Sequence, residues 1–269
     1  MISKKAWFHV DMDGLDAIYQ GQGLRFRGRD EFYSSAVENS LQFFERQGIT
    51  ATYFLIAKDL DDDFKRDAVR KIVKAGHKIS CHSLNHLYLN KIDSRAKREE
   101  IVTAKRKIED SLGVECKGFR APGYSIDYES LELLFEAGYR YDSSVFPNYH
   151  FRQRLEIERL FPEPFLMFPE EKFFEIPLPY TAPLLPPFHP CYSFYLSRFY
   201  FNRSLRTFAK HNNYLTLLFH LTDFADKQNL SQGLRLNVFT NNLFSTKTKL
   251  SFLSKVVDRI RKDFSFTTT

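Results

Sequence analysis

Residues 37–57, VENSLQFFERQGITATYFLIA, run from an amphipathic helix through a glycine into an apolar strand. Val37, Leu41 and Phe44 recur at the spacing of one helix face. Gly48 stands just past the predicted helix end, where a left-handed cap favours glycine. The apolar run at 51–57 that follows is typical of a buried strand. This stretch predicts one helix-to-strand unit of an α/β fold.

The same order recurs along the first half of the chain. Helical patterns that end at Gly76, Gly113 and Gly138 are each followed within a few residues by a β-rich run. Strands that alternate with helices in this way predict a parallel sheet. Strands are expected within the segments 6–13, 51–57, 77–83, 114–122, 139–144, 173–179 and 213–220. Seven strands fit a closed or nearly closed barrel better than an open sheet.

The second half of the chain is less regular. Residues 147–191 are rich in proline and aromatic residues, which predicts a long loop or a cap over one end of the barrel. The stretch 192–206 is interpreted as a barrel helix with a buried face, with a position on a membrane surface as the alternative. The apolar pattern at 250–264 predicts a closing helix. Because the sequence has no Gly/Ser linker, residues 1–269 are expected to form a single domain.

The composition describes a folded, moderately basic protein. The formal net charge of +6 suits an anionic polymer, a phosphate-bearing lipid carrier or a membrane surface. It suits nucleic acid equally, but the chain has no recognition motif for it, so no nucleic-acid partner is expected. Cys81, Cys116 and Cys191 lack CxxC spacing, which argues against a disulfide framework and a cysteine-rich zinc site.

The start of the chain predicts a cytoplasmic location. Its first apolar run is interrupted by His9, Asp11 and Asp13 and is too short for the apolar region of a signal peptide. No segment approaches the ~18 uninterrupted apolar residues of a membrane span. Peripheral contact with a membrane remains an open alternative.

Ionisable residues gather at the predicted carboxyl ends of the strands. They are Asp11, Asp13, His82, Arg120, Asp142 and His220. In parallel barrels this rim is where active sites assemble. Such a distribution is not expected of residues that merely solvate a surface, so the rim is the candidate active site.

Two pairs in this set have the spacing of metal ligands. Asp11 and Asp13 are two residues apart and would project to the same side of a strand, where a nearby cation would relieve their repulsion. His82 and His86 are four residues apart and would share one face of a helical turn. Two histidines and one carboxylate form an open site for Zn²⁺ or a similar ion.

The remaining rim residues suggest acid–base chemistry. Arg120 could hold a carboxylate ionised and oriented, although an arginine can also cap loop carbonyls. His220 follows an apolar strand and could be a core histidine. With Asp142 close enough to raise its pKa, it becomes a general acid.

Three motifs, HSLNH (82–86), FRAPGY (119–124) and YDSSVFP (141–147), together resemble those of a known family. From Asp11 to about Asp223 the chain is similar to the polysaccharide deacetylases, the carbohydrate esterases that share the nodulation-deacetylase homology domain. Residues 118–147 resemble a branch often associated with exopolysaccharide gene clusters. The resemblance implies a distorted seven-stranded (β/α) barrel, similar to a TIM barrel. It also implies a metal-dependent N-deacetylase that releases acetate from an amino sugar in a polysaccharide, oligosaccharide or glycan precursor.

The resemblance also implies a role for each matched residue. Asp11 corresponds to the catalytic base, Arg120 to the residue that orients it, and His220, with Asp142 as its partner, to the acid. The metal ligands implied are Asp13, His82 and His86. The backbone N–H of Tyr124 would stabilise the oxyanion, and Pro122 and Tyr124 would contact substrate. One divalent ion is expected, Zn²⁺ first, with Co²⁺ or Ni²⁺ as alternatives.

The sequence departs from the common family pattern at three places. Met12 separates two aspartates that are often adjacent, Phe146 takes the place of a common tryptophan, and Leu-Thr-Asp follows His220 where relatives often have Pro-Trp-Glu. Alternatives therefore stay open. The chain could remove formyl or another acyl group from a lipid-linked or nucleotide-linked sugar or another small amide, or it could be an inactive glycan-binding module. The sugar, the native metal and the oligomeric state are not determined by the sequence.

Overall fold

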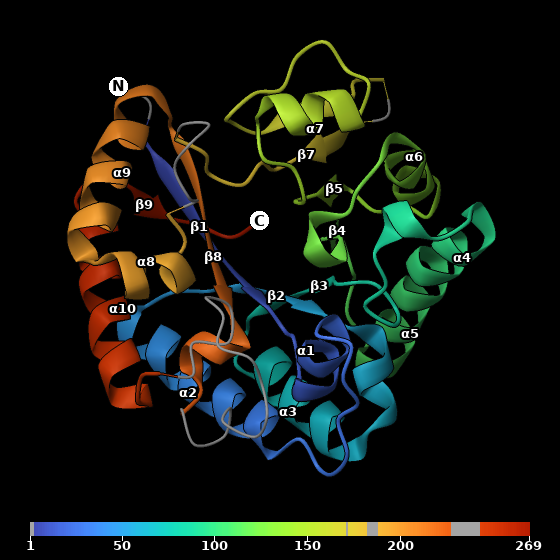
Figure 1. Cartoon of the computed structure of the whole chain (residues 1–269), viewed down its shortest axis with the longest axis horizontal. Coiled ribbons are helices and arrows are strands. Elements are labelled where there is room, and N and C mark those ends of the chain that lie inside the picture. The colour runs from blue at the N-terminus through green and yellow to red at the C-terminus, as the bar shows by residue number, and fades with distance from the viewer. Residues whose placement is uncertain (1–2, 171, 182–187, 227–242) are drawn as a thin grey trace.

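The computed structural model describes residues 3–170, 172–181, 188–226 and 243–269 and shows a curled, mostly parallel sheet flanked by helices (Figure 1). Seven parallel strands lie in the order β7-β5-β4-β3-β2-β1-β8. They are β1 (Lys5–Asp11), β2 (Thr52–Leu55), β3 (Lys78–Cys81), β4 (Gly118–Phe119), β5 (Tyr141–Asp142), β7 (Phe173–Glu175) and β8 (Tyr214–His220). Each overlaps a segment predicted as a strand, and only β1 begins one residue before its predicted segment, so the seven-strand prediction is confirmed.

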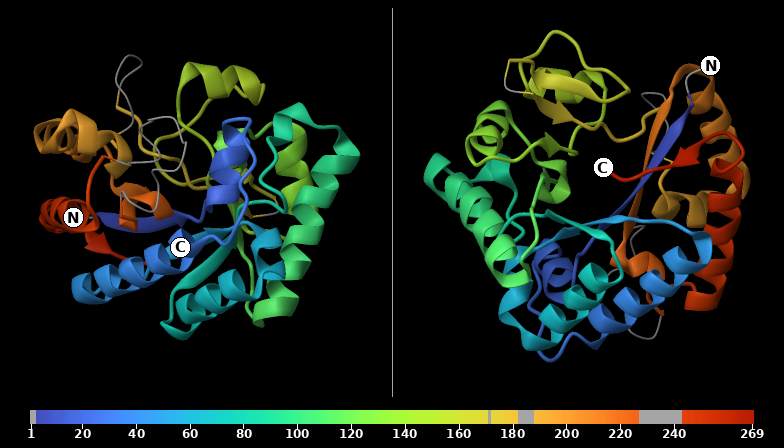
Figure 2. Two further views of the ribbon diagram at one scale, coloured as in Figure 1. Left: turned by 60° about the horizontal axis from the view of Figure 1, so that its bottom comes forward. Right: turned by 180° about the vertical axis from the view of Figure 1, so that it is seen from behind.

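The sheet curls like a barrel without closing (Figure 2). In the described residues its hydrogen-bonded path ends at β8 on one side and, on the other, at β6 (Phe165–Phe168), which pairs antiparallel with β7. The short strand β9 (Ser265–Phe266) pairs with β1. The expected distorted α/β barrel is therefore confirmed in an open form.

Helices pack around the outside of this sheet (Figure 2). The longer ones are α2 (Glu31–Gln47), α3 (Asp63–Lys74), α5 (Ala104–Leu112), α6 (Tyr128–Glu136), α9 (Arg198–His211) and α10 (Thr246–Ile260). The shorter ones are α1 (Leu15–Gly21), α4 (Ser94–Arg98), α7 (Tyr149–Arg154) and α8 (Pro190–Leu196). As predicted, α2 ends at Gly48, whose φ of 61° is the left-handed conformation that glycine adopts most easily. Within the described residues, none of the helices has the length and apolarity needed to cross a bilayer.

Two predictions about the second half need correction. The segment 147–191 contains α7, β6, β7 and the start of α8. Aromatic contacts hold β6 in place, since Phe168 packs on Phe135 of α6 and Phe173 of β7. The stretch 192–206 is not one helix but the end of α8 and the start of α9, separated at Ser197 with a φ of 89°. Residues 182–187 lie outside the described residues.

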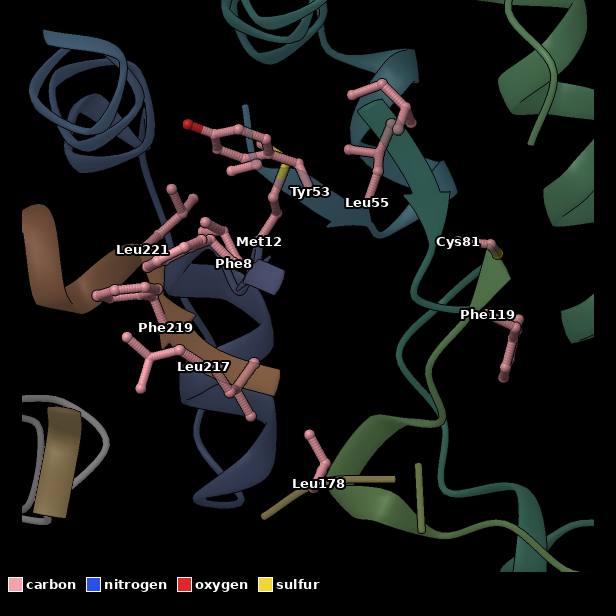
Figure 3. Close-up of a cluster of buried hydrophobic side chains, with 14 of the residues drawn as sticks. Phe8, Met12, Tyr53, Leu55, Cys81, Phe119, Leu178, Leu217, Phe219 and Leu221 are labelled. Atoms are coloured by element: carbon pink, nitrogen blue, oxygen red, sulfur yellow. The ribbon is translucent and has the colours of Figure 1, made fainter. Parts of the chain in front are cut away.

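The core lies on both faces of the strands. Figure 3 shows Phe8, Met12, Phe219 and neighbouring apolar side chains gathered around β1 and β8. Burying a side chain of this size stabilises the fold by roughly 1.5–3 kcal/mol. A second, smaller cluster joins strands that are far apart in the sheet order, and it consists of Trp7, Phe54, Tyr141 and Ile176. Asp11 and Asp142 end two of the strands that carry this cluster, so it helps to hold the site in position.

Candidate active site

The ionisable residues predicted at the strand ends do gather at one rim of the sheet. Asp11 and His220 are the last residues of β1 and β8 and are partners in the strand register. His82 and Arg120 directly follow β3 and β4. A pocket of about 210 Å³ opens here, and its lining includes Asp11, Asp13, His82, His86, Tyr124 and His220.

Asp13, His82 and His86 meet at the pocket as a candidate metal centre. One potential ligand atom from each lies within 4.8 Å of the other two. Asp13 Oδ1 is 2.9 Å from His86 Nε2 and 3.6 Å from His82 Nε2. The Nδ1 atom of His82 lies 2.7 Å from the carbonyl oxygen of Arg120, which places the proton on Nδ1 and leaves Nε2 to bind a cation. This donor set, open to a pocket on one side, fits Zn²⁺ or a similar ion.

The charge states of Asp13 and His82 suit a cation, whereas His86 would have to release a proton, because the charge of Asp13 outweighs burial and raises the pKa of His86. Burial alone would raise the pKa of Asp13, but the charge and hydrogen bond of His86 hold that pKa well below its usual range. Burial lowers the pKa of His82, although Asp11 and Asp13 oppose this effect. An ionised carboxylate beside a neutral imidazole is the form in which these side chains bind metals.

The two histidines do not share a helical turn, as the sequence suggested. Residues 82–86 form a loop in which Ser83 has a φ of 65° and His86 a φ of 62°. The Ser83 hydroxyl accepts the backbone N–H of His86 at 3.0 Å, which stabilises this left-handed conformation. The imidazole rings nevertheless lie with their centroids 5.0 Å apart.

Glu100 anchors this loop and was not identified from the sequence. Its carboxylate accepts the backbone N–H groups of Leu84 and Asn85 at 3.1 and 2.9 Å and the side-chain amide of Asn85 at 2.7 Å. The residue is buried within a π-helical turn, Glu99–Thr103, and such turns are frequent at functional sites. In the sequence, its position next to Ile101, on a helix face that is otherwise apolar, was the one indication that Glu100 is buried.

Arg120 holds Asp11 in one orientation. The guanidinium is fully buried and donates from Nη1 to Asp11 Oδ1 at 2.8 Å. Its Nε and Nη2 donate to the carbonyl and hydroxyl oxygens of Ser143, at 2.7 and 2.8 Å. Nη2 also lies 2.7 Å from Nδ1 of His9, and the guanidinium carbon lies 4.2 Å from the centre of the Phe54 ring. The predicted Asp11–Arg120 contact is therefore present.

His9 is a second partner of Arg120 that no sequence pattern predicted. Burial, assisted by the nearby charge of Arg120, holds the pKa of His9 well below its usual range. The imidazole is therefore neutral and can accept the proton of Nη2. Because each of the three guanidinium nitrogens has a partner, the guanidinium is fixed and Asp11 has little freedom to rotate.

The expected pairing of Asp142 with His220 needs correction. The two oxygens of Asp142 accept the backbone N–H and the hydroxyl of Ser144, at 2.9 and 2.8 Å. Asp142 also bonds to Glu175, its partner in the β5–β7 register. His220 Nε2 instead lies 4.0 Å from Asp11 Oδ2. We therefore assign Asp142 to the support of the Arg120 turn, since the hydroxyl of Ser144 accepts the N–H of Ala121.

The role expected for the Tyr124 backbone also needs correction. Its N–H donates to the carbonyl of Ala121 at 2.9 Å and is therefore engaged within the turn. The side chain does line the pocket, beside Gly123. Pro122 is buried, and its carbonyl accepts the N–H of Ser125, so it shapes the turn behind the pocket wall. Contact of Tyr124 with substrate stays a prediction.

A buried ion network supports the loop that carries Asp13. Lys65 donates to Asp16 and Asp59 at 2.8 and 2.9 Å and lies 3.5 Å from Asp30. Asp30 also accepts the backbone N–H of Leu15 at 2.7 Å. The network joins residues that are far apart in the sequence, so no local pattern predicted it.

Comparisons with known proteins identify relatives among the polysaccharide deacetylases. The polysaccharide deacetylase family model matches residues 29–141. A peptidoglycan deacetylase of Helicobacter pylori is 31% identical over 110 residues, which cover 40% of this chain and 36% of that protein. The curated relatives that the chain matches are aligned over only 20% to 42% of their own length.

Solved structures share the fold at lower identity. A putative polysaccharide deacetylase from Mycobacterium smegmatis is 17% identical with a TM-score of 0.63, and the alignment covers 95% of this chain and 85% of that one. A CE4 family pseudoenzyme from Bacillus anthracis is 10% identical with a TM-score of 0.55, covering 99% and 64%. At these identities the likeness concerns the fold alone.

Proposed function

Because the chain belongs to the polysaccharide deacetylase family, we propose that it is a metal-dependent hydrolase that removes the N-acetyl group from an amino sugar. The substrate would be a polysaccharide, an oligosaccharide or a glycan precursor, and acetate would be released. One observation carries this proposal. The cluster of Asp13, His82 and His86 shares a pocket with Asp11 and His220, two groups suited to move protons.

Asp13, His82 and His86 would hold the ion, for which Zn²⁺ is our first choice and Co²⁺ or Ni²⁺ the alternatives. A divalent ion held there would polarise the acyl carbonyl and lower the pKa of an adjacent water molecule. The neutral His82 and the ionised Asp13 described above need no protonation change to serve as ligands.

Asp11 would act as the general base. Arg120 fixes one of its oxygens, and the other lies 4.0 Å from His220 Nε2. Water would add its oxygen to the acyl carbon while Asp11 accepts the proton of that water. A base held in one orientation saves the entropy of finding the reactive geometry.

His220 would act as the general acid. It faces Asp11 across the pocket and could donate a proton to the sugar nitrogen as the carbon–nitrogen bond breaks. The products would be the free amino sugar and acetate, and the proton that Asp11 took from water would replace the one that His220 gave to the amine.

The pocket wall suggests a small acyl group. Ala17, Ile18 and Gly123 contribute to its lining, and its volume of about 210 Å³ leaves room for a compact apolar substituent. An acetyl methyl group would offer Ala17 and Ile18 an apolar contact that a formyl group lacks. Acetyl is therefore our choice over formyl.

The test is a measurement of acid release from a panel of N-acetylated and N-formylated sugars, both free and linked to lipid or nucleotide. Zinc-loaded wild-type protein is expected to release acetate from at least one N-acetylated sugar, and Asp11→Asn should abolish the release. Release of formate only would favour the deformylase alternative. Binding of glycans without any release of acid would favour an inactive glycan-binding module and contradict the proposal.

A further inference from the structure

The helix α9 carries exposed positive charge and has no acidic residue of its own. The sequence contains no Asp or Glu between Glu175 and Asp223. Within that interval α9 exposes four cations to solvent, namely Arg198, Arg203, Arg206 and Lys210. Like charges on neighbouring turns of a helix repel one another, and an anionic partner would relieve this repulsion.

The helix α10 extends this positive face. A groove of about 830 Å³ runs between α9 and α10, and its cationic lining residues are Lys4, Arg203, Arg206, Lys210, Arg259 and Lys262. Asp263, the one acidic residue among its described lining residues, pairs with Arg259 at 2.6 Å. A neighbouring groove adds Arg198, Lys247 and Lys255 from the same two helices.

Large apolar side chains project beside these cations. Phe199 is 75% exposed, more than any other large hydrophobic residue in the described part of the chain. Leu196 and Tyr195 are 44% and 38% exposed. The left-handed conformation of Ser197 breaks the helix between Leu196 and Phe199. Exposed aromatic and aliphatic side chains among arginines and lysines are typical of a surface that inserts into the interfacial region of a membrane.

We propose that the face formed by α9, the break at Ser197 and α10, here called the docking face, binds the surface of an anionic lipid bilayer. The arginines and lysines would contact lipid phosphates, and Phe199 and Leu196 would enter the boundary between headgroups and acyl chains. Leu196 favours a bilayer over an acidic glycan as the partner. An aliphatic side chain has no aromatic ring on which a sugar could stack, but it can enter a bilayer. The inference does not depend on the proposed deacetylase activity.

The docking face and the catalytic pocket can act at the same time. None of the residues that line the two basic grooves lines the catalytic pocket. In Figure 1, α9 and α10 form the left flank of the molecule. The helix α1, which contributes to the pocket lining, lies away from this flank, at the C-terminal end of β1. Bilayer contact would therefore retain the protein at a membrane and leave the pocket accessible.

Co-sedimentation with lipid vesicles tests the inference. The full chain is expected to bind vesicles of phosphatidylcholine mixed with phosphatidylglycerol at low salt, and to bind vesicles of phosphatidylcholine alone much less. The triple variant Arg203→Gln/Arg206→Gln/Lys210→Gln should lower the partition coefficient by at least about tenfold, since each surface cation contributes measurably to binding. Phe199→Ser, which leaves the charge unchanged, should lower it about threefold or more.

A matched control removes the same charge elsewhere. Lys74→Gln/Arg95→Gln/Arg106→Gln neutralises three exposed cations outside the docking face and should retain most of the binding. All variants should keep the thermal stability of the wild type. Equal loss of binding in the control triple variant would overturn the inference, because net charge alone would then explain the binding. So would an unaffected Phe199→Ser variant, or binding to a soluble acidic polysaccharide but not to vesicles.

Discussion

Replacement of Glu175 by Gln removes the titratable proton of this buried carboxyl group but keeps its hydrogen bonds. Glu175 Oε1 accepts the N–H of Val145 at 3.1 Å. Both oxygens of Asp142 already accept hydrogen bonds from Ser144, so the proton shared by the two acids belongs on Glu175. Burial, followed by the charge of Asp142, raises the pKa of Glu175 well above its usual range. Burial also raises the pKa of Asp142 to about 6.

The consequence is a pH-dependent stability of known sign. Near neutral pH the folded protein retains the proton of Glu175, whereas the unfolded chain, with a pKa of about 4.3, has released it. The stabilisation is fully present below the unfolded pKa and is lost as the pH rises towards the folded pKa. One proton corresponds to about 1.4 kcal/mol per pH unit between the unfolded pKa and the folded pKa.

Glutamine keeps the geometry without the proton. Its amide oxygen can accept the N–H of Val145, and its NH₂ group can donate to Asp142. Glu175→Gln should therefore remove the roughly 1.4 kcal/mol per pH unit from the slope of unfolding free energy against pH. Glu175→Ala should instead destabilise the fold by about 2–6 kcal/mol, since two buried polar groups lose their partner at about 1–3 kcal/mol each.

Urea unfolding at a series of pH values measures this slope. Glu132→Gln, at an exposed position of α6, is the matched control and should leave the slope unchanged. If Glu175→Gln unfolds with the same pH dependence as the wild type, then Glu175 carries no proton in the folded state and the assignment above is wrong.

Three further substitutions probe the support of the site. Arg120→Lys keeps the charge but cannot hold Asp11 and Ser143 together, so the turnover rate should fall about 100-fold; an unchanged rate would deny that the fork positions the base. Glu100→Ala frees the loop of residues 82–86 and should weaken metal binding by about 10–100-fold in a competition titration; equal affinity would contradict the anchoring role. Gly118→Ala places a Cβ atom 2.0 Å from the Tyr141 ring and should cost about 1–3 kcal/mol in urea unfolding, which a neutral result would refute.

Local patterns in the sequence were enough to predict the strands and the rim. Apolar runs after glycine-capped helices located all seven parallel strands, because strand burial and helix periodicity are local properties. The carboxyl ends of parallel strands share one edge, so Asp11, His82, Arg120 and His220 could be placed together before their contacts were known.

The remaining features depend on contacts between distant parts of the chain. Glu175 and Asp142 are partners across β5 and β7, and Glu100 reaches the loop after β3 from a helix. No periodicity in the sequence encodes such pairs. The left-handed conformations of Ser83 and Ser197 were missed for a related reason, since serine does not mark a positive φ as glycine does.

The most direct test of the account is metal binding to variants of Asp11 and Asp13, the two aspartates at and just after the end of β1. Wild-type protein stripped of metal should bind one zinc ion per chain by calorimetry and metal analysis. Asp11→Asn should bind zinc with similar affinity but show no acetate release, whereas Asp13→Asn and His82→Ala should lose both. If Asp13→Asn binds zinc like the wild type while Asp11→Asn does not, the assignment of ligand and base, and with it the proposed mechanism, is contradicted.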